Sequence, residues 1–240
     1  MVGLQDAEVL KLKDVHTFYG KSHIIQGISL SIQEEECIAL LGRNGTGKTT
    51  TLRSIMGLNP PQGGEIFFKG RAISGKKPFE ISREGIGYVP EDRRIFVTLT
   101  VLENLRIAKQ RRAKNERWSL ETIFEAFPLL AERRNHRGSQ LSGGEQQMLT
   151  IARSLMGNPE LLLIDEPTEG LAPLIIEVVV KIIQRIKNEG TTIFLVEQNL
   201  EATYQVADLY YILQQGLIVY HGSREEFRGN PQLKEEYLGV

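Results

Sequence analysis

Cysteine is almost absent from this sequence of 240 residues, which contains only Cys37. A single cysteine cannot form a disulfide within the chain, and it excludes a zinc site built from several cysteines. Cys37 opens the apolar run Cys-Ile-Ala-Leu-Leu at residues 37–41. Because a free cysteine in such a run behaves as a small apolar side chain, we expect a buried thiol rather than a reactive one.

An excess of charge and a long hydrophobic run are also missing. Lys and Arg number 29 against 30 Asp and Glu, so the net charge is −1, whereas domains that bind nucleic acid are normally basic. The longest apolar stretch, residues 171–186, is interrupted by Glu177 and Lys181, and it is too short and too charged to span a membrane. Residues 1–12 lack the apolar core of a signal peptide. We therefore expect a soluble, intracellular protein that does not cross a membrane and binds no nucleic acid.

Strand-like and helix-like segments alternate along the chain. Residues 10–12, 28–32 and 66–68 have β-type composition between turns. Four runs are almost wholly apolar, as is typical of parallel strands buried on both faces: residues 37–41, 86–89, 161–164 and 192–196. Helical periodicity appears at residues 48–56, 145–156 and 174–187. In the last of these, the apolar residues expected on the buried face are Leu174, Val178, Ile182, Ile183 and Ile186. The alternation predicts an α/β fold with a mainly parallel sheet.

The segment between Pro90 and Gln140 is polar and helical in pattern. Its basic residues are Arg106, Lys109, Arg111, Arg112, Lys114, Arg117, Arg133, Arg134 and Arg137. They form either a docking surface or, as is commoner for a run of charge, the solvent-facing sides of helices.

Further along, residues 210–213 and 217–220 flank a turn and predict a hairpin. Ser223 and Glu226 have the spacing of a helix capping box.

Residues 42–49, Gly-Arg-Asn-Gly-Thr-Gly-Lys-Thr, match the phosphate-loop pattern G-x-x-x-x-G-K-[ST]. The loop follows an apolar strand and opens a helix, so its backbone N–H groups and the helix N-terminus can surround anionic oxygens. Lys48 should reach the β- and γ-phosphates of ATP, and the Thr49 hydroxyl should bind Mg²⁺. The plain alternative is a glycine-rich turn with a surface lysine. The residues expected to contact the nucleotide here are Gly42, Arg43, Asn44, Gly45, Thr46, Gly47, Lys48, Thr49 and Thr50.

Two acids end the apolar strand at residues 161–164. The carboxyl ends of parallel strands form the ligand-binding edge of open α/β folds. Asp165 is therefore placed to hold Mg²⁺, and Glu166 to accept a proton from an attacking water. Taken alone, two solvated acids before the turn at Pro167 would explain the pattern equally well, but a phosphate loop in the same chain favours the catalytic interpretation.

A third motif, Leu-Ser-Gly-Gly-Glu-Gln-Gln at residues 141–147, opens another helix. Ser142, Gly143, Gly144 and Glu145 would offer a hydroxyl and accessible N–H groups at the helix N-terminus, which suits a phosphate. One nucleotide does not need two such surfaces in one chain. The simplest arrangement is that each chain presents this motif to a nucleotide held by another.

The order of these three motifs resembles that of the ATP-binding cassette (ABC) ATPases, over the whole chain from about residue 10. The resemblance implies a P-loop nucleotidase core with a mainly parallel sheet, an antiparallel β subdomain and an α-helical subdomain. It implies a single domain over residues 1–240. Residues of about 1–90 and 160–240 would form the core with the β subdomain, and about 91–159 the helical subdomain that carries the signature motif.

The resemblance also implies further roles. Tyr19 stands where the family stacks an aromatic ring on adenine, although a tyrosine at a strand end needs no such role. Glu91 takes the place of a glutamine that contacts Mg²⁺ and the transport partner, so the metal site would comprise Thr49, Glu91 and Asp165. Ala172 replaces an aspartate that commonly bridges two subunits. Gln198 replaces a histidine beside the γ-phosphate, so the expected catalytic residues are Lys48, Glu166 and Gln198.

Within the family, Pro-Glu-x-x-Arg-x-Phe at residues 90–96, Gly-Leu-Ala-Pro, Val-Glu-Gln-Asn and the terminal Tyr-Leu-Gly resemble the smaller ATPase subunit of high-affinity branched-chain amino-acid importers. This implies a peripheral protein on the cytoplasmic face of the cell membrane. Its partners would be integral-membrane permease subunits, docked on residues 90–140, a paralogous ATPase or a second copy in a head-to-tail dimer, and a periplasmic or surface solute-binding protein. The alternatives are an importer of another solute, a soluble ABC switch, and a nucleotide-binding regulator without catalysis, against which Glu166 argues.

Overall fold

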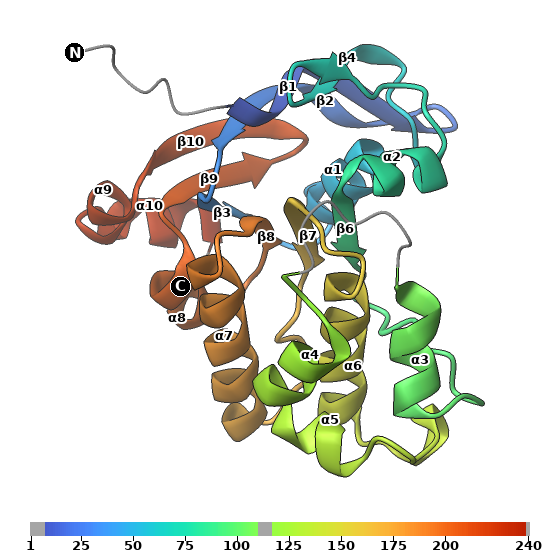
Figure 1. Cartoon of the computed structure of the whole chain (residues 1–240). Coiled ribbons are helices and arrows are strands. Elements are labelled where there is room, and N and C mark those ends of the chain that lie inside the picture. The colour runs from blue at the N-terminus through green and yellow to red at the C-terminus, as the bar shows by residue number, and fades with distance from the viewer. Residues whose placement is uncertain (1–7, 110–116, 239–240) are drawn as a thin grey trace, which may run out of the picture.

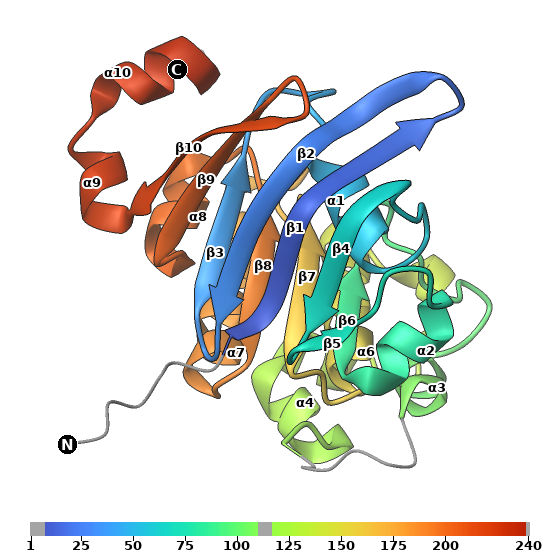
Figure 2. The ribbon, with the colours of Figure 1, turned by 90° about the horizontal axis from the view of Figure 1, so that it is seen from above.

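A computed structural model describes residues 8–109 and 117–238 of the chain. Within these ranges the strands form a four-stranded antiparallel sheet and a six-stranded, mainly parallel sheet, and the two lie face to face (Figure 2). The antiparallel sheet has the order β2-β1-β4-β5, with bounds Ser22–Gln33, Glu8–Tyr19, Gly63–Phe68 and Arg71–Ala72. The three β-type segments predicted in the first third of the sequence are therefore confirmed, although β1 and β2 are longer than their alternating apolar residues indicated.

The mainly parallel sheet carries the four apolar runs as neighbouring strands. Its order is β10-β9-β3-β8-β7-β6, with bounds Leu217–Ser223, Leu209–Gln214, Cys37–Leu41, Thr192–Val196, Leu161–Asp165 and Ile86–Val89. β3, β6, β7, β8 and β9 run in parallel, and β10 pairs with β9 in the predicted hairpin. The ends of β3, β7 and β8 consequently meet at one edge, where Leu40 pairs with Val196 and Asp165 pairs with the same residue from the other side.

Both faces of the mainly parallel sheet are buried, as the unbroken apolar runs predicted. Leu40 and Leu163 face the antiparallel sheet, together with Leu52 of α1 (Lys48–Ile55). Cys37 and Leu162 face the opposite layer of helices. Alternate residues of one strand point to opposite faces, so a fully apolar strand fills both cores at once. The Cys37 thiol is fully buried, and burial raises its pKa to about 12.

Helices cover the second face and one end of the sheet (Figure 1). Their bounds along the chain are α2 Pro78–Glu84, α3 Val101–Ala108, α4 Leu120–Ala126, α5 Pro128–Glu132, η1 Gly138–Gln140, α6 Gly143–Leu155, α7 Pro173–Asn188, α8 Leu200–Val206, α9 Arg224–Arg228, α10 Pro231–Leu233 and η2 Lys234–Leu238. The predicted capping box begins α9, where Ser223 accepts a hydrogen bond from the Glu226 amide and the Ser223 amide bonds to the Glu226 carboxylate. In the described ranges, none of the helices combines the length and the apolar character needed to cross a membrane.

The prediction that Leu174 lies on the buried face of α7 is wrong, because its side chain is 76% exposed. The buried face instead runs from the partly buried Ile175 through Val179, Ile182 and Ile186. Successive helical residues are separated by about 100° around the axis. Leu174 is therefore rotated well away from the row that begins one residue later.

The buried side-chain amide of Asn104 fixes the backbone of the segment before α3 through hydrogen bonds. Asn104 accepts a hydrogen bond from the Phe96 amide (2.9 Å) and donates to the carbonyls of Phe96 and Thr100 (both 3.0 Å). The segment nevertheless leaves the side chains of Phe96 and Val97 half-exposed. Of the predicted basic residues, Arg106 and Lys109 face solvent, while Arg111, Arg112 and Lys114 lie outside the described residues.

Candidate nucleotide-binding site

The phosphate loop connects β3 to α1, and its glycines are sterically required. The backbone φ of Gly42 is 155°, and a Cβ there would lie 2.4 Å from the Leu213 carbonyl oxygen. At Gly47, with φ 112°, a Cβ would lie 2.7 Å from Ile25. Within residues 8–109 and 117–238, no side chain caps the first turn of α1. Its N–H groups therefore remain available to an anion, as phosphate binding at a helix N-terminus requires.

Lys48 is a buried cation at the start of α1, with 4% of its side chain exposed. Its ammonium donates to the carbonyls of Gly42 (2.9 Å) and Arg43 (3.2 Å). It also forms an ion pair with Glu166 Oε1 at 3.2 Å. The loop thus curls around its own lysine, and the lysine faces the carboxylate that follows β7.

Glu166 lies between two of the other predicted site residues. On the side opposite Lys48, the Gln198 amide donates to Glu166 Oε2 at 2.6 Å and to Asn44 Oδ1 at 2.6 Å. Glu166 is only 8% exposed, and its φ of 43° lies in the left-handed region that few side chains adopt without strain. Lys48 at the start of α1, Glu166 after β7 and Gln198 after β8 come from the segments that follow three different strands, and the structure brings all three together.

Asp165 lies deeper, with both carboxylate oxygens engaged. Thr49 Oγ1 donates to Oδ1 and the Tyr88 phenol to Oδ2, both at 3.1 Å. Burial raises the pKa of Asp165 to about 6, against the opposing effect of these two hydrogen bonds. A buried carboxylate beside a hydroxyl is the oxygen donor set that Mg²⁺ prefers, so the residues fit this cation. No group of three or more His, Cys, Asp or Glu in the described part of the chain is arranged to hold a metal by itself.

A further acidic residue, Glu169, lies at this edge, and the sequence reasoning missed it. Glu169 lies beside the carboxylates of Glu166 and Glu91. The hydrogen bond with Glu166 is the largest cause that raises the pKa of Glu169 to about 7, followed by desolvation and then by the negative charges of Glu166 and Glu91. Glu91 is exposed and also acts on Asp165 through its negative charge. The signal available in the sequence was an acid three residues beyond Glu166, in the short loop that leads to α7.

Tyr19 ends β1 with 46% of its surface exposed. Its phenol accepts a hydrogen bond from Arg53 of α1, and this bond raises the pKa of the arginine. The hydroxyl end of the Tyr19 ring is thus fixed next to α1, the helix that follows the phosphate loop, and the ring itself is partly exposed.

The signature motif forms a well-capped helix start apart from the phosphate loop. Ser142 Oγ accepts from the Glu145 amide (3.3 Å), and Glu145 accepts from the Ser142 amide (2.8 Å) and from Arg133 (3.2 Å). Among the described residues, these side chains make no hydrogen bond to residues 42–49. A Cβ on Gly143 would lie 2.6 Å from the Arg93 guanidinium, and one on Gly144 would lie 2.7 Å from Ile175.

Arg93, which the sequence reasoning did not single out, connects this motif to the loop after β7. Its guanidinium lies against Gly143 and donates to the Glu169 carbonyl at 3.0 Å. Tyr88 and Glu197 were missed as well. Glu197 follows β8 directly, just as Glu166 follows β7, and this repeated position was the signal that could have identified it.

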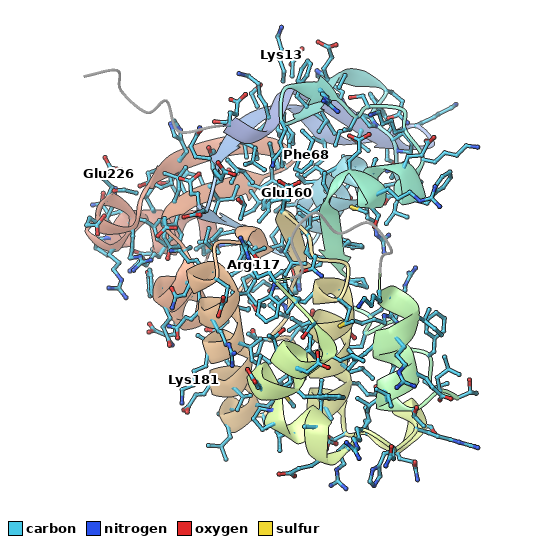
Figure 3. All side chains as sticks on the ribbon, in the orientation of Figure 1. Lys13, Phe68, Arg117, Glu160, Lys181 and Glu226 are labelled. Atoms are coloured by element: carbon cyan, nitrogen blue, oxygen red, sulfur yellow. The ribbon has the colours of Figure 1, made fainter. Side chains whose placement is uncertain are left out.

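A cavity of about 560 Å³ lies at the opposite edge of the sheet. Its lining contains equal numbers of acidic and basic side chains, among them Lys69, Arg117 and Glu160. Lys69 and Glu160 form an ion pair with each other; Figure 3 labels Phe68, Arg117 and Glu160 along this wall. Such a balanced lining has no preference for a polyanion, so this cavity does not compete with the phosphate loop as the candidate nucleotide site.

Comparison with known proteins identifies the family and the fold. Residues 25–169 match the ABC transporter family. The chain is 40% identical over 232 residues to the high-affinity branched-chain amino acid transport ATP-binding protein BraG of Pseudomonas aeruginosa, which covers 96% of this chain and 100% of BraG. It is 33% identical to the lipopolysaccharide export system ATP-binding protein LptB of Haemophilus influenzae, over 96% of this chain and 97% of LptB. Among solved structures, the ADP conformation of an ATP-binding cassette of an ABC transporter superposes with a TM-score of 0.81 at 26% identity, over 97% of this chain and 99% of that one.

The group of carboxylates around Glu169 predicts a pH-dependent stability. The pKa of Glu169 is raised to about 7 in the folded chain, so the native state binds more protons than the unfolded state between about pH 4.5 and 7. The stability that protonated Glu169 contributes is therefore lost as the pH rises through that window. Glu169→Gln should therefore raise the melting temperature at pH 8 and leave it nearly unchanged at pH 4, below the unfolded pKa. Glu132→Gln, at an exposed position on α5, is the matched control. An equal shift at both pH values, or none at pH 8, would contradict the assignment.

Proposed function

The chain belongs to the ABC transporter family of ATPases, and we propose that it hydrolyses ATP to power a membrane importer of branched-chain amino acids. The observation that carries the catalytic part is the meeting of Lys48, Glu166 and Gln198 in front of the uncapped N-terminus of α1. A cation, a general base and an amide donor around a phosphate loop are the groups that ATP hydrolysis requires.

In this proposal, residues 42–50 surround the phosphates, and Tyr19 stacks on the adenine with its exposed ring. Mg²⁺ would be held by Thr49 and Asp165, with Glu91 beside them, and would supply positive charge to the phosphates. Because the protein offers few ligands of its own, phosphate oxygens and water would complete the coordination.

The ion pair between Lys48 and Glu166 implies that ATP binding precedes proton transfer to Glu166. A γ-phosphate competes with Glu166 for the ammonium of Lys48, since both are anions in reach of the same buried cation. Once Lys48 turns to the phosphate, the Glu166 carboxylate is free to accept a proton from the attacking water. Gln198, now bonded to Glu166 and Asn44, can donate one neutral hydrogen bond to the γ-phosphate.

A head-to-tail pair of chains would complete the site. Ser142, Gly143, Gly144 and Glu145 form a capped helix start that makes no hydrogen bond to its own phosphate loop within the described ranges, and this supports its use on the nucleotide of another chain. The amide of Gln198 carries no charge, so its hold on a phosphate is weaker than that of a protonated histidine. This favours a partnership with a paralogous ATPase over a second copy of the same chain.

Asn104 fixes the backbone at Phe96. The half-exposed side chains of Phe96 and Val97, together with the exposed Ile107 of α3, would supply an apolar surface for the permease subunits. Docking there would hold the chain peripherally at the cytoplasmic face of the membrane. The division into a core of about residues 1–90 and 160–240 and a helical subdomain of about 91–159 places this surface, with the signature motif, on the helical part. A periplasmic or surface solute-binding protein would deliver the solute.

Replacing the proposed base tests the catalytic part. Glu166→Gln keeps the shape of the side chain but cannot take up a proton, so ATP hydrolysis should fall by about 10²–10⁴-fold. ATP binding should persist, and size-exclusion chromatography with Mg-ATP should show a dimer that outlasts that of the wild type. Glu201→Gln, an exposed position on α8, is the matched control and should hydrolyse ATP normally. Unchanged hydrolysis by a monomeric Glu166→Gln variant would contradict the role of Glu166.

The similarity to LptB favours export of a lipopolysaccharide as the second candidate. Transport by the complete complex in proteoliposomes separates the two. We expect ATP-dependent leucine uptake by the wild-type complex and none by the complex with Glu166→Gln. ATP-dependent release of lipopolysaccharide without leucine uptake would overturn the solute assignment and leave the ATPase assignment intact.

A further inference from the structure

Glu197 is a buried carboxylate that none of the roles above uses. Its side chain is 2% exposed. Oε1 accepts hydrogen bonds from the Thr168 amide (3.0 Å) and the Thr168 hydroxyl (2.6 Å). Oε2 accepts from the amides of Gln198 (2.7 Å) and Asn199 (2.9 Å). All four bonds come from donors at the ends of two neighbouring strands.

These donors belong to the two loops that carry the candidate catalytic residues. Thr168 lies in the β7–α7 loop, residues 166–172, which begins with Glu166 and contains Glu169. Gln198 and Asn199 lie in the β8–α8 loop, residues 197–199, where Asn199 also caps α8 by accepting from the Ala202 amide. The two strands end side by side, with Asp165 paired to Val196. Beyond that pair, the Glu197 carboxylate accepts hydrogen bonds from the β7–α7 loop with Oε1 and from the β8–α8 loop with Oε2.

The chemistry of this bridge requires two acceptor oxygens. Burial raises the pKa of Glu197, and the four donors oppose that shift. An unsatisfied buried N–H destabilises the folded state, so the backbone amides of both loops are held where the carboxylate can reach them. An amide side chain of the same shape has one oxygen and one NH₂ group. It could satisfy one loop only, and its own N–H groups would face the backbone N–H groups of the other.

We propose that Glu197 is a positioning residue for ATP hydrolysis, which keeps the Gln198 amide beside the Glu166 carboxylate by fixing the β8–α8 loop to the β7–α7 loop. The inference rests on the proposed function, in which Gln198 contacts the γ-phosphate and Glu166 is the base. The Glu197 carboxylate thereby supports the contact that the Gln198 amide makes with Glu166 across the same two loops.

A double-mutant cycle tests the proposal on the full chain with Mg-ATP. Glu197→Gln should lower kcat by about tenfold or more, because small misplacements of reacting groups have effects of that size. The KM for ATP should change by less than about threefold, since the contacts of Lys48 are untouched. In a Gln198→Ala background the same substitution should have little further effect, because residues that act through one another are not additive. Glu201→Gln is the isosteric control.

Thr168 gives a second, milder pair of variants should Glu197→Gln fail to fold, which thermal unfolding would reveal. Thr168→Ala removes the shortest bond of the bridge and should lower kcat, whereas Thr168→Ser keeps the hydroxyl and should restore it. An equal loss with and without Gln198, or no loss at all, would overturn the role of Glu197 while leaving the proposed function standing. An unchanged kcat for Gln198→Ala alone would instead contradict the proposed role of Gln198, and the inference would fail with it.

Discussion

The contact on which the rest of the site depends is that of the Glu166 carboxylate with Lys48 on one side and Gln198 on the other. Three strands that are far apart in the sequence must end at one edge for this contact to form, and β3, β8 and β7 do so because they are neighbours in a parallel sheet. The carboxylate also needs a backbone in the left-handed region, which is held by the hydrogen bond from the Glu166 amide to the Val196 carbonyl. The fold thus fixes the carboxylate that we propose as the base beside the ammonium of Lys48.

The charges at this edge explain why the site suits a nucleotide bound with a divalent cation. Asp165 and Glu169 have pKa values raised to about 6 and 7, the first mainly by burial and the second mainly by its carboxylate neighbours. Four carboxylates lie at this edge, those of Glu91, Asp165, Glu166 and Glu169, and Lys48 forms an ion pair with one of them, Glu166. In the proposed function, the N–H groups of α1 and Lys48 would attract the phosphates, while the carboxylates would attract the cation that accompanies them.

Much of this could be predicted from sequence because the signals are local. Unbroken apolar runs identified β3, β6, β7 and β8, and the phosphate loop and the Asp165–Glu166 pair each lie within a few residues of a strand end. Glu197, Tyr88 and Arg93 could not be assigned in the same way, since their partners are set by strand order and loop packing. The reason for Gly143 and Gly144 is also tertiary: Arg93 and Ile175 pack where a side chain would be. The prediction for Leu174 was wrong because successive residues are rotated by about 100° around the helix axis, so an error of one residue points the side chain to another side of the helix.

The central claim is that the phosphates of ATP replace Glu166 as the partner of Lys48. Titration of Mg-ATP binding to Lys48→Ala tests it most directly, with Lys11→Ala, at an exposed position on β1, as the control for removing one lysine. Because lost charge-assisted hydrogen bonds cost about 1.5–3 kcal/mol each, ATP affinity should fall at least about tenfold in Lys48→Ala. It should stay unchanged in Lys11→Ala. Binding of ATP to Lys48→Ala with the wild-type affinity would contradict the account.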